Sequence, residues 1–249
     1  MRLFLFVFIF FSSSAFSTIC PTINWDQTVR VKLINDGDTL TLENGRLVRF
    51  IGINTPEINY RNISKSEPYA LKAKALVERY VTIGDKVHLF FDKDKQDKYG
   101  RILAYVYSKT GRDLAALQLQ AGFAKQWVIG KNDYFWRCFQ ETERQARVNK
   151  KGLWADFTPL HAAKLTKKDR GYQYIKGEIS KIIKNKKEMN IFLDNKLKIR
   201  LSLANVQKFI SNNINFSVHD NLLLRGRVFF NGKSPQLTLY HPVQILSEK

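Results

Sequence analysis

The chain has 249 residues, of which 44% are hydrophobic. This is enough apolar material for an ordinary core, and it excludes a protein that is disordered throughout. The 41 Lys and Arg residues outnumber the 22 Asp and Glu residues and give a formal net charge of +19. A surplus of this size favours a polyanionic partner, such as nucleic acid or an anionic membrane surface.

The first residues predict export. Arg2 precedes the apolar run 3–11, and Ala15-Phe16-Ser17 then supplies a small-x-small cleavage site. We interpret residues 1–19 as a signal peptide and expect a periplasmic or extracellular protein; retention as an uncleaved anchor is the alternative. The apolar run is short for a bilayer and no later segment approaches a spanning length, so we expect no stable membrane association after cleavage.

The two cysteines, Cys20 and Cys138, leave two states open. An exported protein meets an oxidising compartment, which permits a disulfide between them. Cys138 also stands in an apolar helical run, where a small buried thiol is equally consistent. The sequence does not choose between these states.

The N-terminal two-thirds of the chain predicts strands and then helices. Turn signals of the Asn-Asp-Gly and Glu-Asn-Gly type separate the first alternating segments, and a capping box, Ser64-x-x-Glu67, predicts the start of a helix that ends before Gly84. Two further helices are expected from Asp113 to Gly122 and from about Asn132 to Asn149. The predicted strands span 29–33, 39–42, 47–51, 86–91 and 102–107.

The C-terminal part predicts a second, smaller unit. Thr158-Pro159 and a basic cluster indicate a linker over 159–170, between one domain at 22–158 and another at 171–249. A helix is expected over 204–212, and the predicted strands span 175–183, 189–194, 196–203, 221–230 and 236–246. We therefore predict an α+β protein that is mainly β: a five-stranded barrel with three helices, followed by a second small barrel.

Three separated segments carry polar residues of catalytic type. They are Asp36-Gly37-Asp38-Thr39, then Arg49 with Asn54-Thr55-Pro56-Glu57, then Asp97 through Arg101. Each alone is ordinary turn or loop chemistry. In this order, with Ile102-Leu103-Ala104-Tyr105 and the closing Gly152-Leu153-Trp154, they resemble the staphylococcal nuclease family over residues 28–156.

The resemblance implies an OB-fold barrel and a calcium-dependent endonuclease. It makes Asp38 a calcium ligand and Thr55 the source of a backbone carbonyl, and Ca²⁺ does prefer such oxygens. Glu57 corresponds to the carboxylate that directs the attacking water, while Arg49 and Arg101 correspond to the cations that grip the scissile phosphate. The implied substrates are single-stranded DNA and RNA, cut at the 5′ P–O bond to leave 3′-phosphates. The sequence leaves the oligomeric state open, and a monomer is the expectation. Apart from the resemblance, Asp92, Asp94 and Asp97 are expected to be solvated loop charges, with Asp97 a candidate to brace Arg101.

One position departs from the family pattern. Asn54 stands where well-known members have a second aspartate ligand, and its amide oxygen brings no negative charge to a metal ion. Asn54 remains in the predicted ligand set, with weaker metal binding expected. The rival hypothesis is a non-catalytic nucleic-acid-binding module whose metal site Asn54 has disabled. The family's base-stacking tyrosines fall near Trp127 and Val128 without a match, so no base-binding residue is carried over.

The second unit resembles OB-fold nucleic-acid-binding modules. Residues 161–249 hold 17 Lys and Arg against 6 Asp and Glu, so this unit is the more basic one. Four lysines are expected to line a turn between strands and to follow a phosphate backbone: Lys181, Lys184, Lys186 and Lys187. Phe192, Phe229 and Tyr240 are candidates for base stacking, although core packing is the expectation for each.

Overall fold

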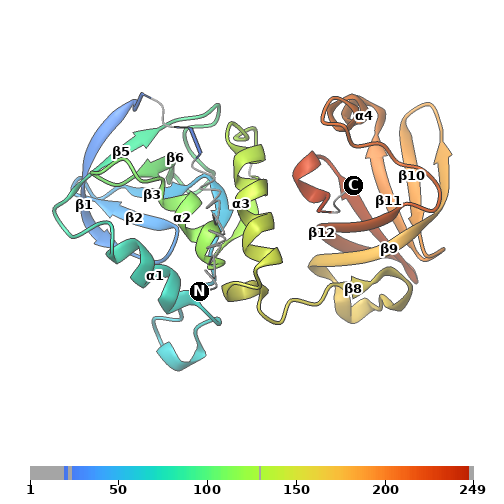
Figure 1. The fold of residues 1–249 in the computed structure, drawn as a ribbon, viewed down its shortest axis with the longest axis horizontal. Helices are drawn as coiled ribbons and strands as arrows, with labels where there is room; N and C mark the ends of the chain where they lie inside the picture. Colours follow the sequence, from blue (N-terminus) through green and yellow to red (C-terminus); the bar gives the residue numbers. More distant parts are fainter. Residues whose placement is uncertain (1–19, 22–23, 129, 247–249) are drawn as a thin grey trace, which may run out of the picture.

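The computed structural model describes residues 20–21, 24–128 and 130–246. The predicted signal peptide, residues 1–19, lies outside them. Two β-barrels stand side by side, with helix α3 (Trp136–Val148) between them (Figure 1). This confirms the predicted α+β fold class of two five-stranded barrels. Within the described ranges, no helix has the length and apolar character needed to cross a membrane.

The first barrel closes in the order β1-β2-β3-β6-β5, and β3 pairs with β6 in parallel. Side chains that alternate along these strands fill it, for example Val31, Leu40 and Leu89, each fully buried. The sequence predicted all five strands to within about two residues at either end. Their bounds are β1 (Gln27–Ile34), β2 (Thr39–Leu42), β3 (Leu47–Phe50), β5 (Lys86–Phe90) and β6 (Ile102–Tyr107).

Helices α1 (Ala70–Glu78) and α2 (Leu114–Ala121) complete the first unit with α3. Helix α2 has the predicted ends, because Asp113 caps its first N–H groups and Gly122 takes a left-handed conformation after it. The predicted capping box before α1 is wrong. Ser64 lies in a short 3₁₀ helix (Ile63–Lys65), and the Glu67 carboxylate accepts a hydrogen bond from the backbone N–H of Glu57 instead.

Helix α3 begins at Trp136, four residues later than expected. The reason is a tertiary contact: the Asn132 side chain accepts from the backbone N–H of Asp94 and donates to the carbonyl of the same residue. These hydrogen bonds hold the segment before α3 against the β5–β6 connection and out of the helix.

A short two-stranded ribbon was not predicted. Strand β4 (Gly52–Asn54) pairs in antiparallel fashion with β7 (Lys125–Trp127), so that Asn54 lies opposite Lys125 and Gly52 opposite Trp127. Gly52 has φ +86°, and a Cβ on it would lie 2.5 Å from the Phe139 ring of α3. A glycine is therefore required for the ribbon to pack on α3. Three-residue strands carry too little alternation to be seen in sequence.

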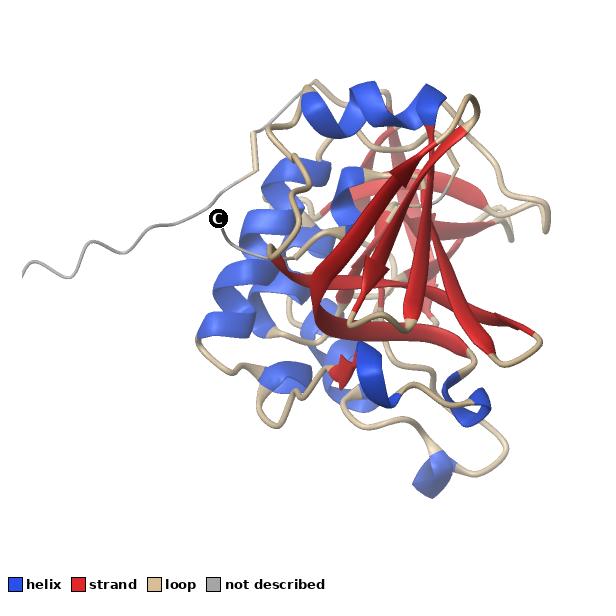
Figure 2. Ribbon diagram, turned by 90° about the vertical axis from the view of Figure 1, so that its right-hand side faces the viewer, coloured by secondary structure: helices blue, strands red, loops and turns tan. Residues whose placement is uncertain are grey.

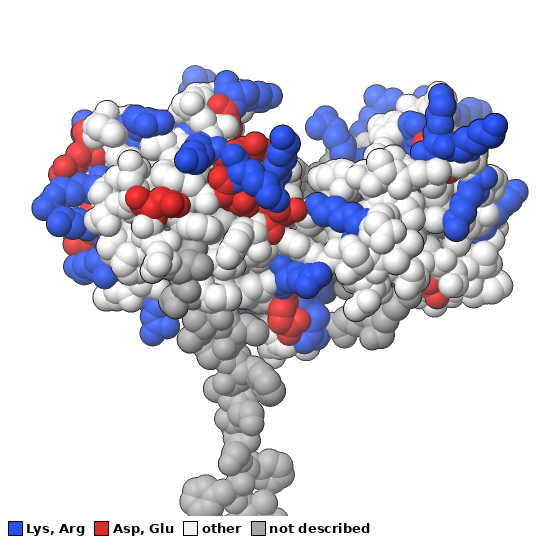
Figure 3. Space-filling model, turned by 90° about the horizontal axis from the view of Figure 1, so that it is seen from above, with Lys and Arg blue, Asp and Glu red and all other residues white. Residues whose placement is uncertain are grey.

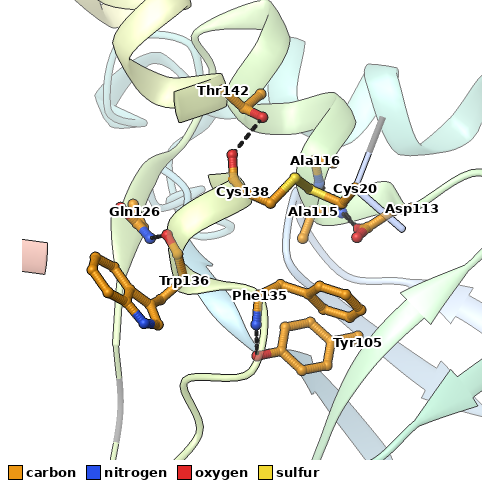
Figure 4. Close-up of a disulfide and its surroundings, with 10 residues drawn as sticks. All are labelled: Cys20, Tyr105, Asp113, Ala115, Ala116, Gln126, Phe135, Trp136, Cys138 and Thr142. Carbon is orange, nitrogen blue, oxygen red and sulfur yellow. Dashed lines mark hydrogen bonds between the residues drawn. A yellow bond between two sulfur atoms is a disulfide. The ribbon is translucent and has the colours of Figure 1, made fainter. Parts of the chain in front are cut away.

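Cys20 and Cys138 form a disulfide across 118 residues of sequence. It fastens the start of the described chain to the first turns of α3, next to Asp113 and the beginning of α2 (Figure 4). Of the two states that the sequence left open, the structure has the bonded one.

The second barrel repeats the topology of the first. Its order is β10-β11-β13-β12-β9, closed by a β10–β9 pairing, and β11 pairs with β13 in parallel. Figure 2 looks onto the strands of this barrel from the side away from the first unit. Helix α4 (Leu203–Ile210) connects the third strand to the fourth, as α1 does in the first barrel. The bounds are β9 (Gly171–Lys184), β10 (Glu188–Leu193), β11 (Leu197–Ser202), β12 (Asn221–Asn231) and β13 (Ser234–Leu239).

Two segments of the second unit differ from expectation. Strand β13 ends at Leu239 and not at residue 246, because the His241 side chain accepts from the N–H of Val243 and starts a 3₁₀ turn (Pro242–Gln244). The segment 159–170, expected to be a linker, contributes β8 (Leu160–His161), which pairs with β9. It also packs Ala162 and Leu165 into the second core.

The junction between the barrels is buried. An apolar cluster joins Ala146 of α3 and Trp154 to Tyr174 of β9 and to Leu246. Beside it, Arg225 of β12 forms an ion pair with Glu143 of α3, and both side chains are fully buried. Arg225 also donates to the Gln126 side chain of β7 at 2.9 Å. The second barrel is thus docked on the ribbon β4–β7 and on α3.

Candidate active site

The turn between β1 and β2 places Asp38 at the edge of the first barrel. Gly37 allows this turn to lie against α1, because a Cβ there would stand 2.6 Å from Cβ of Ala73. The buried Gln118 of α2 donates to the carbonyls of Gly37 and Ala73 and fixes the turn from below. Asp38 is only 4% exposed, so its position is set by the core.

The Asp38 carboxylate is surrounded by donors. Its Oδ2 atom lies 3.0 Å from Nη2 of Arg49, which is 5% exposed. The same oxygen accepts from the backbone N–H of Thr55 at 2.7 Å and from the Thr55 hydroxyl at 2.9 Å. Burial makes each of these charge-assisted hydrogen bonds strong.

Asn54 and Thr55 complete this cluster. Nη2 of Arg49 donates to the Asn54 amide oxygen at 2.9 Å, so the same guanidinium group bridges Asp38 and Asn54. Nη1 of Arg49 donates to the carbonyl of Phe50 and holds the group in place. The Thr55 carbonyl accepts a long hydrogen bond from the Asn54 amide at 3.4 Å. The three residues predicted as metal ligands therefore lie together.

Glu57 belongs to the same electrostatic cluster. Partial burial raises the pKa of its carboxyl group, the Asp38 charge raises it further, and Arg49 and Arg101 oppose the rise. The backbone of Glu57 is fixed by hydrogen bonds with Glu67. Its side chain remains exposed.

Arg101 approaches from the β5–β6 connection. Its Nε atom lies 2.7 Å from Oδ2 of Asp97, and its backbone N–H donates to Oδ1 of the same carboxylate. Asp97 thus braces Arg101, and is not the solvated loop charge that the sequence favoured. The brace leaves Arg101 half-buried and close enough to influence the pKa of Glu57.

The structure adds Asp36, the first residue of the Asp36-Gly37-Asp38-Thr39 segment, to this cluster. Its Oδ1 atom accepts from the backbone N–H of Asp38. Burial, followed by the charge of Asp38 and later that of Glu57, raises the pKa of Asp36 to about 6. The Asp-Gly-Asp spacing was the available signal. Three carboxylates therefore share this corner of the barrel with Arg49 and Arg101.

Within the part of the chain that the structure describes, no three His, Cys, Asp or Glu side chains are grouped closely enough to hold a metal ion by themselves. The ligand set that the sequence predicts is of another kind: one carboxylate from Asp38, the amide oxygen of Asn54 and the backbone carbonyl of Thr55. Hard oxygen donors of this kind suit Ca²⁺. The mutual repulsion of Asp36, Asp38 and Glu57 also favours a cation beside them.

Lys125 of β7 is a further residue that sequence reasoning missed. It lies opposite Asn54 in the ribbon, and both line a hollow of about 270 Å³ with Thr55, Pro56 and Glu67. Burial lowers the pKa of the Lys125 amino group. No motif marked it, because its relation to Asn54 exists only through the β4–β7 pairing.

The four lysines predicted to bind nucleic acid lie apart from this cluster. Strands β9 and β10 form the hairpin that carries them, and Lys181, Lys184, Lys186 and Lys187 are all exposed. Strand β10 lies on the side of the second barrel remote from the first unit (Figure 1). On the face in Figure 3, Lys and Arg cover both units, whereas acidic residues gather mainly on the first.

The fold and this cluster define an OB-fold protein with paired carboxylate and guanidinium groups at one barrel edge. A family model described as "Staphylococcal nuclease homologue" matches residues 47–156. The thermonuclease of Staphylococcus hyicus is 31% identical over 135 residues, which cover 53% of this chain and 78% of that protein. Endonuclease YncB of Bacillus subtilis is 36% identical over 125 residues, 48% of this chain and 58% of its own. The prophage-derived endonuclease YokF of Bacillus subtilis is 37% identical over 125 residues, 41% of its length.

The chain belongs to the staphylococcal nuclease family. These matches cover about half of it. The family model spans residues 47–156, which include Arg49, Glu57 and Arg101. The relatives named above are a thermonuclease and two endonucleases, and the part matched by the family model runs from β3 through α3.

Proposed function

We propose that this protein is a calcium-dependent endonuclease that hydrolyses the phosphodiester bonds of DNA and RNA. One observation carries the proposal: the buried pair Asp38–Arg49 lies in a single electrostatic cluster with Glu57 and Arg101. Binding of a polyanion would not require carboxylates in the pocket that receives the phosphate, because they repel it. A hydrolytic site does require them, for the metal ion and for the water.

Calcium is proposed as the cofactor, held by Asp38, Asn54 and the Thr55 carbonyl. When bound, the ion would polarise a phosphate oxygen and stabilise charge on it. Asn54 contributes an oxygen but no charge, so we expect affinity in the weak range of extracellular sites, about 0.1 to 1 mM.

The remaining steps belong to the protein side chains. Glu57 accepts a proton from the attacking water, or orients that water, and its raised pKa makes it a stronger base than an ordinary carboxylate. Arg49 and Arg101 donate to the phosphate oxygens as negative charge grows on them in the transition state. Arg49 must release part of its contact with Asp38 or Asn54 to do so.

The substrate follows from the family resemblance. Single strands of DNA and RNA would be cut at the 5′ P–O bond to give 3′-phosphates, by a monomer. No sequence preference is expected, because contacts to phosphate carry no direct sequence information. The four lysines of the β9–β10 hairpin would add affinity for the backbone.

We propose that the protein is exported, to the periplasm or beyond the cell. Two features support this: the signal-like sequence at the N-terminus and the disulfide Cys20–Cys138, which is of a kind that persists in oxidising compartments.

Digestion of matched single-stranded DNA and RNA, with Ca²⁺ or with a chelator, tests the proposal. We expect cleavage only with Ca²⁺, and we expect Glu57→Gln to lower kcat about 10²- to 10⁴-fold. Glu43→Gln, a change at an exposed residue of the β2–β3 turn, is the matched control and should retain activity. Strand binding by the wild type without cleavage in Ca²⁺ would instead support the non-catalytic binding module.

A further inference from the structure

A hollow of about 370 Å³, here called the aromatic hollow, lies where the second barrel meets the ribbon β4–β7. Its lining consists of four aromatic rings, one guanidinium group and one hydroxyl: Trp127, Tyr172, Phe229, Tyr240, Arg227 and Thr238.

Strand alternation explains why these rings face outward. Val228 and Leu237 point into the second core and are buried, so their neighbours Arg227, Phe229 and Thr238 must point to the other face. Phe229 is 38% exposed. Tyr240, the first residue after β13, is 48% exposed. Phe229 and Tyr240 therefore do not take the core positions that the sequence led us to expect.

The first unit supplies one wall. Trp127 of β7 packs against Tyr172 of β9 with ring centroids 4.3 Å apart, and Tyr172 pairs with Arg227 across the sheet. Burial raises the pKa of Tyr172, so its ring stays neutral. The hollow thus exists only because the two units are docked.

Strand β7 connects the aromatic hollow to the separate hollow of about 270 Å³ beside Asn54 and Thr55. Lys125 lies opposite Asn54 and lines that second hollow, while Trp127, the next residue on the same face of β7, lines the aromatic hollow. Two residues along a strand span about 7 Å. This is close to the distance between successive bases of an extended single strand, so Lys125 and Trp127 are spaced to serve neighbouring nucleotides of one strand.

We propose that the aromatic hollow holds an unstacked base of a single-stranded nucleic acid whose backbone lies at the candidate active site. The aromatic rings of the hollow can stack on any base, because every base has a π-face. Arg227 and the nearby Lys125 supply positive charge that attracts the phosphates on either side of that base. The excess of Lys and Arg over residues 161–249 adds to the attraction. The inference rests on the proposed function for the path of the strand.

Binding in a chelator tests this without turnover. The full chain would be titrated against a labelled oligothymidylate or oligouridylate of about 12 nucleotides, and against the same DNA strand with abasic positions, by fluorescence anisotropy. We expect the intact strand to bind about tenfold more tightly than the abasic strand. Phe229→Ala with Tyr240→Ala should abolish this preference.

Two controls separate stacking from folding. Phe229→Tyr with Tyr240→Phe keeps both rings and should keep the preference. Val218→Ala removes an apolar side chain of similar exposure, 44%, from a loop that does not line the hollow, and should change nothing. Equal wild-type affinity for intact and abasic strands, or an alanine variant that weakens both equally, overturns the inference.

Cleavage is measured separately. A protein that prefers intact strands yet does not cut them in Ca²⁺ would refute the nuclease and leave the base-binding hollow standing. A protein that cuts the strands in Ca²⁺ but binds intact and abasic strands equally would support the nuclease and refute the base-binding hollow.

Discussion

Asp38 is a buried acid whose charge is satisfied by Arg49 and Thr55, whereas Asp36 and Glu57 beside it have only partial compensation. Burial, and after it the repulsion among the three carboxylates, raises the pKa of both residues. A divalent cation beside them would offset this repulsion. Asn54 gives the cluster one negative charge fewer than the family pattern, which has a second aspartate at this position.

Asn54→Asp should therefore strengthen calcium binding. An added carboxylate within a few Å of a divalent ion is expected to lower Kd about tenfold, because Coulomb attraction at this distance is only partly screened even though residue 54 is exposed. Isothermal titration calorimetry of the two proteins with CaCl₂ measures the change. Asn59→Asp, in the loop that follows the site, is the control for charge alone. An unchanged Kd in Asn54→Asp would place the ion away from residue 54.

At the scale of elements, α2 supports the site from beneath through Gln118, and Asp113 anchors the start of this helix. Asp113 accepts from the N–H groups of Ala115 and Ala116, yet its pKa is raised to about 7 because burial disfavours the charged form. The cap is thus a buried acid that is neutral in mildly acidic solution.

The consequence is a pH-dependent stability. A carboxyl group whose pKa rises on folding stabilises the protein below its unfolded value near 3.8, and this contribution is lost as pH increases through about 7. Urea unfolding from pH 4 to 7 should show the wild type losing stability relative to Asp113→Asn, which keeps a capping oxygen and does not titrate. Parallel pH profiles for the two proteins would mean that Asp113 stays ionised.

For the whole molecule, the buried pair Arg225–Glu143 connects the two barrels. Glu143 also accepts from the backbone N–H of Gln126, whose side chain accepts from Arg225. The second barrel thereby holds β7, and β7 holds β4 with Asn54 at its end. Removal of one buried partner leaves a desolvated charge behind.

Arg225→Met should lower the free energy of unfolding by about 3 to 5 kcal/mol, because the buried Glu143 loses its short ion pair and keeps only the longer contact with Arg147, at 3.9 Å. Glu143→Gln with Arg225→Met should recover much of this loss, since neither charge remains. Urea denaturation of the single and double variants measures both effects. A double variant as unstable as the single one would show that shape, and not charge pairing, holds the junction.

Local pattern in the sequence determined the strands of both barrels, the ends of α2 and the order of the polar motifs. Each depends on residues a few positions apart: alternation along a strand, an Asp cap, or a glycine after a helix. The start of α3 and the entry to α1 could not be predicted, because Asn132 and Glu67 use their side chains in distant contacts. The resemblance supplied Asp38, Arg49, Asn54, Thr55, Glu57 and Arg101, and the structure brings these together.

Only the tertiary structure decided the Cys20–Cys138 bond, the β4–β7 ribbon, the place of Lys125 and the docking of the barrels through Arg225. The aromatic hollow is of the same kind, since Trp127 and Tyr172 come from different units. The physical reason is common to all of them. A pairing between residues dozens of positions apart is selected by the free energy of the whole folded protein. The sequence around one partner therefore does not reveal the identity of the other.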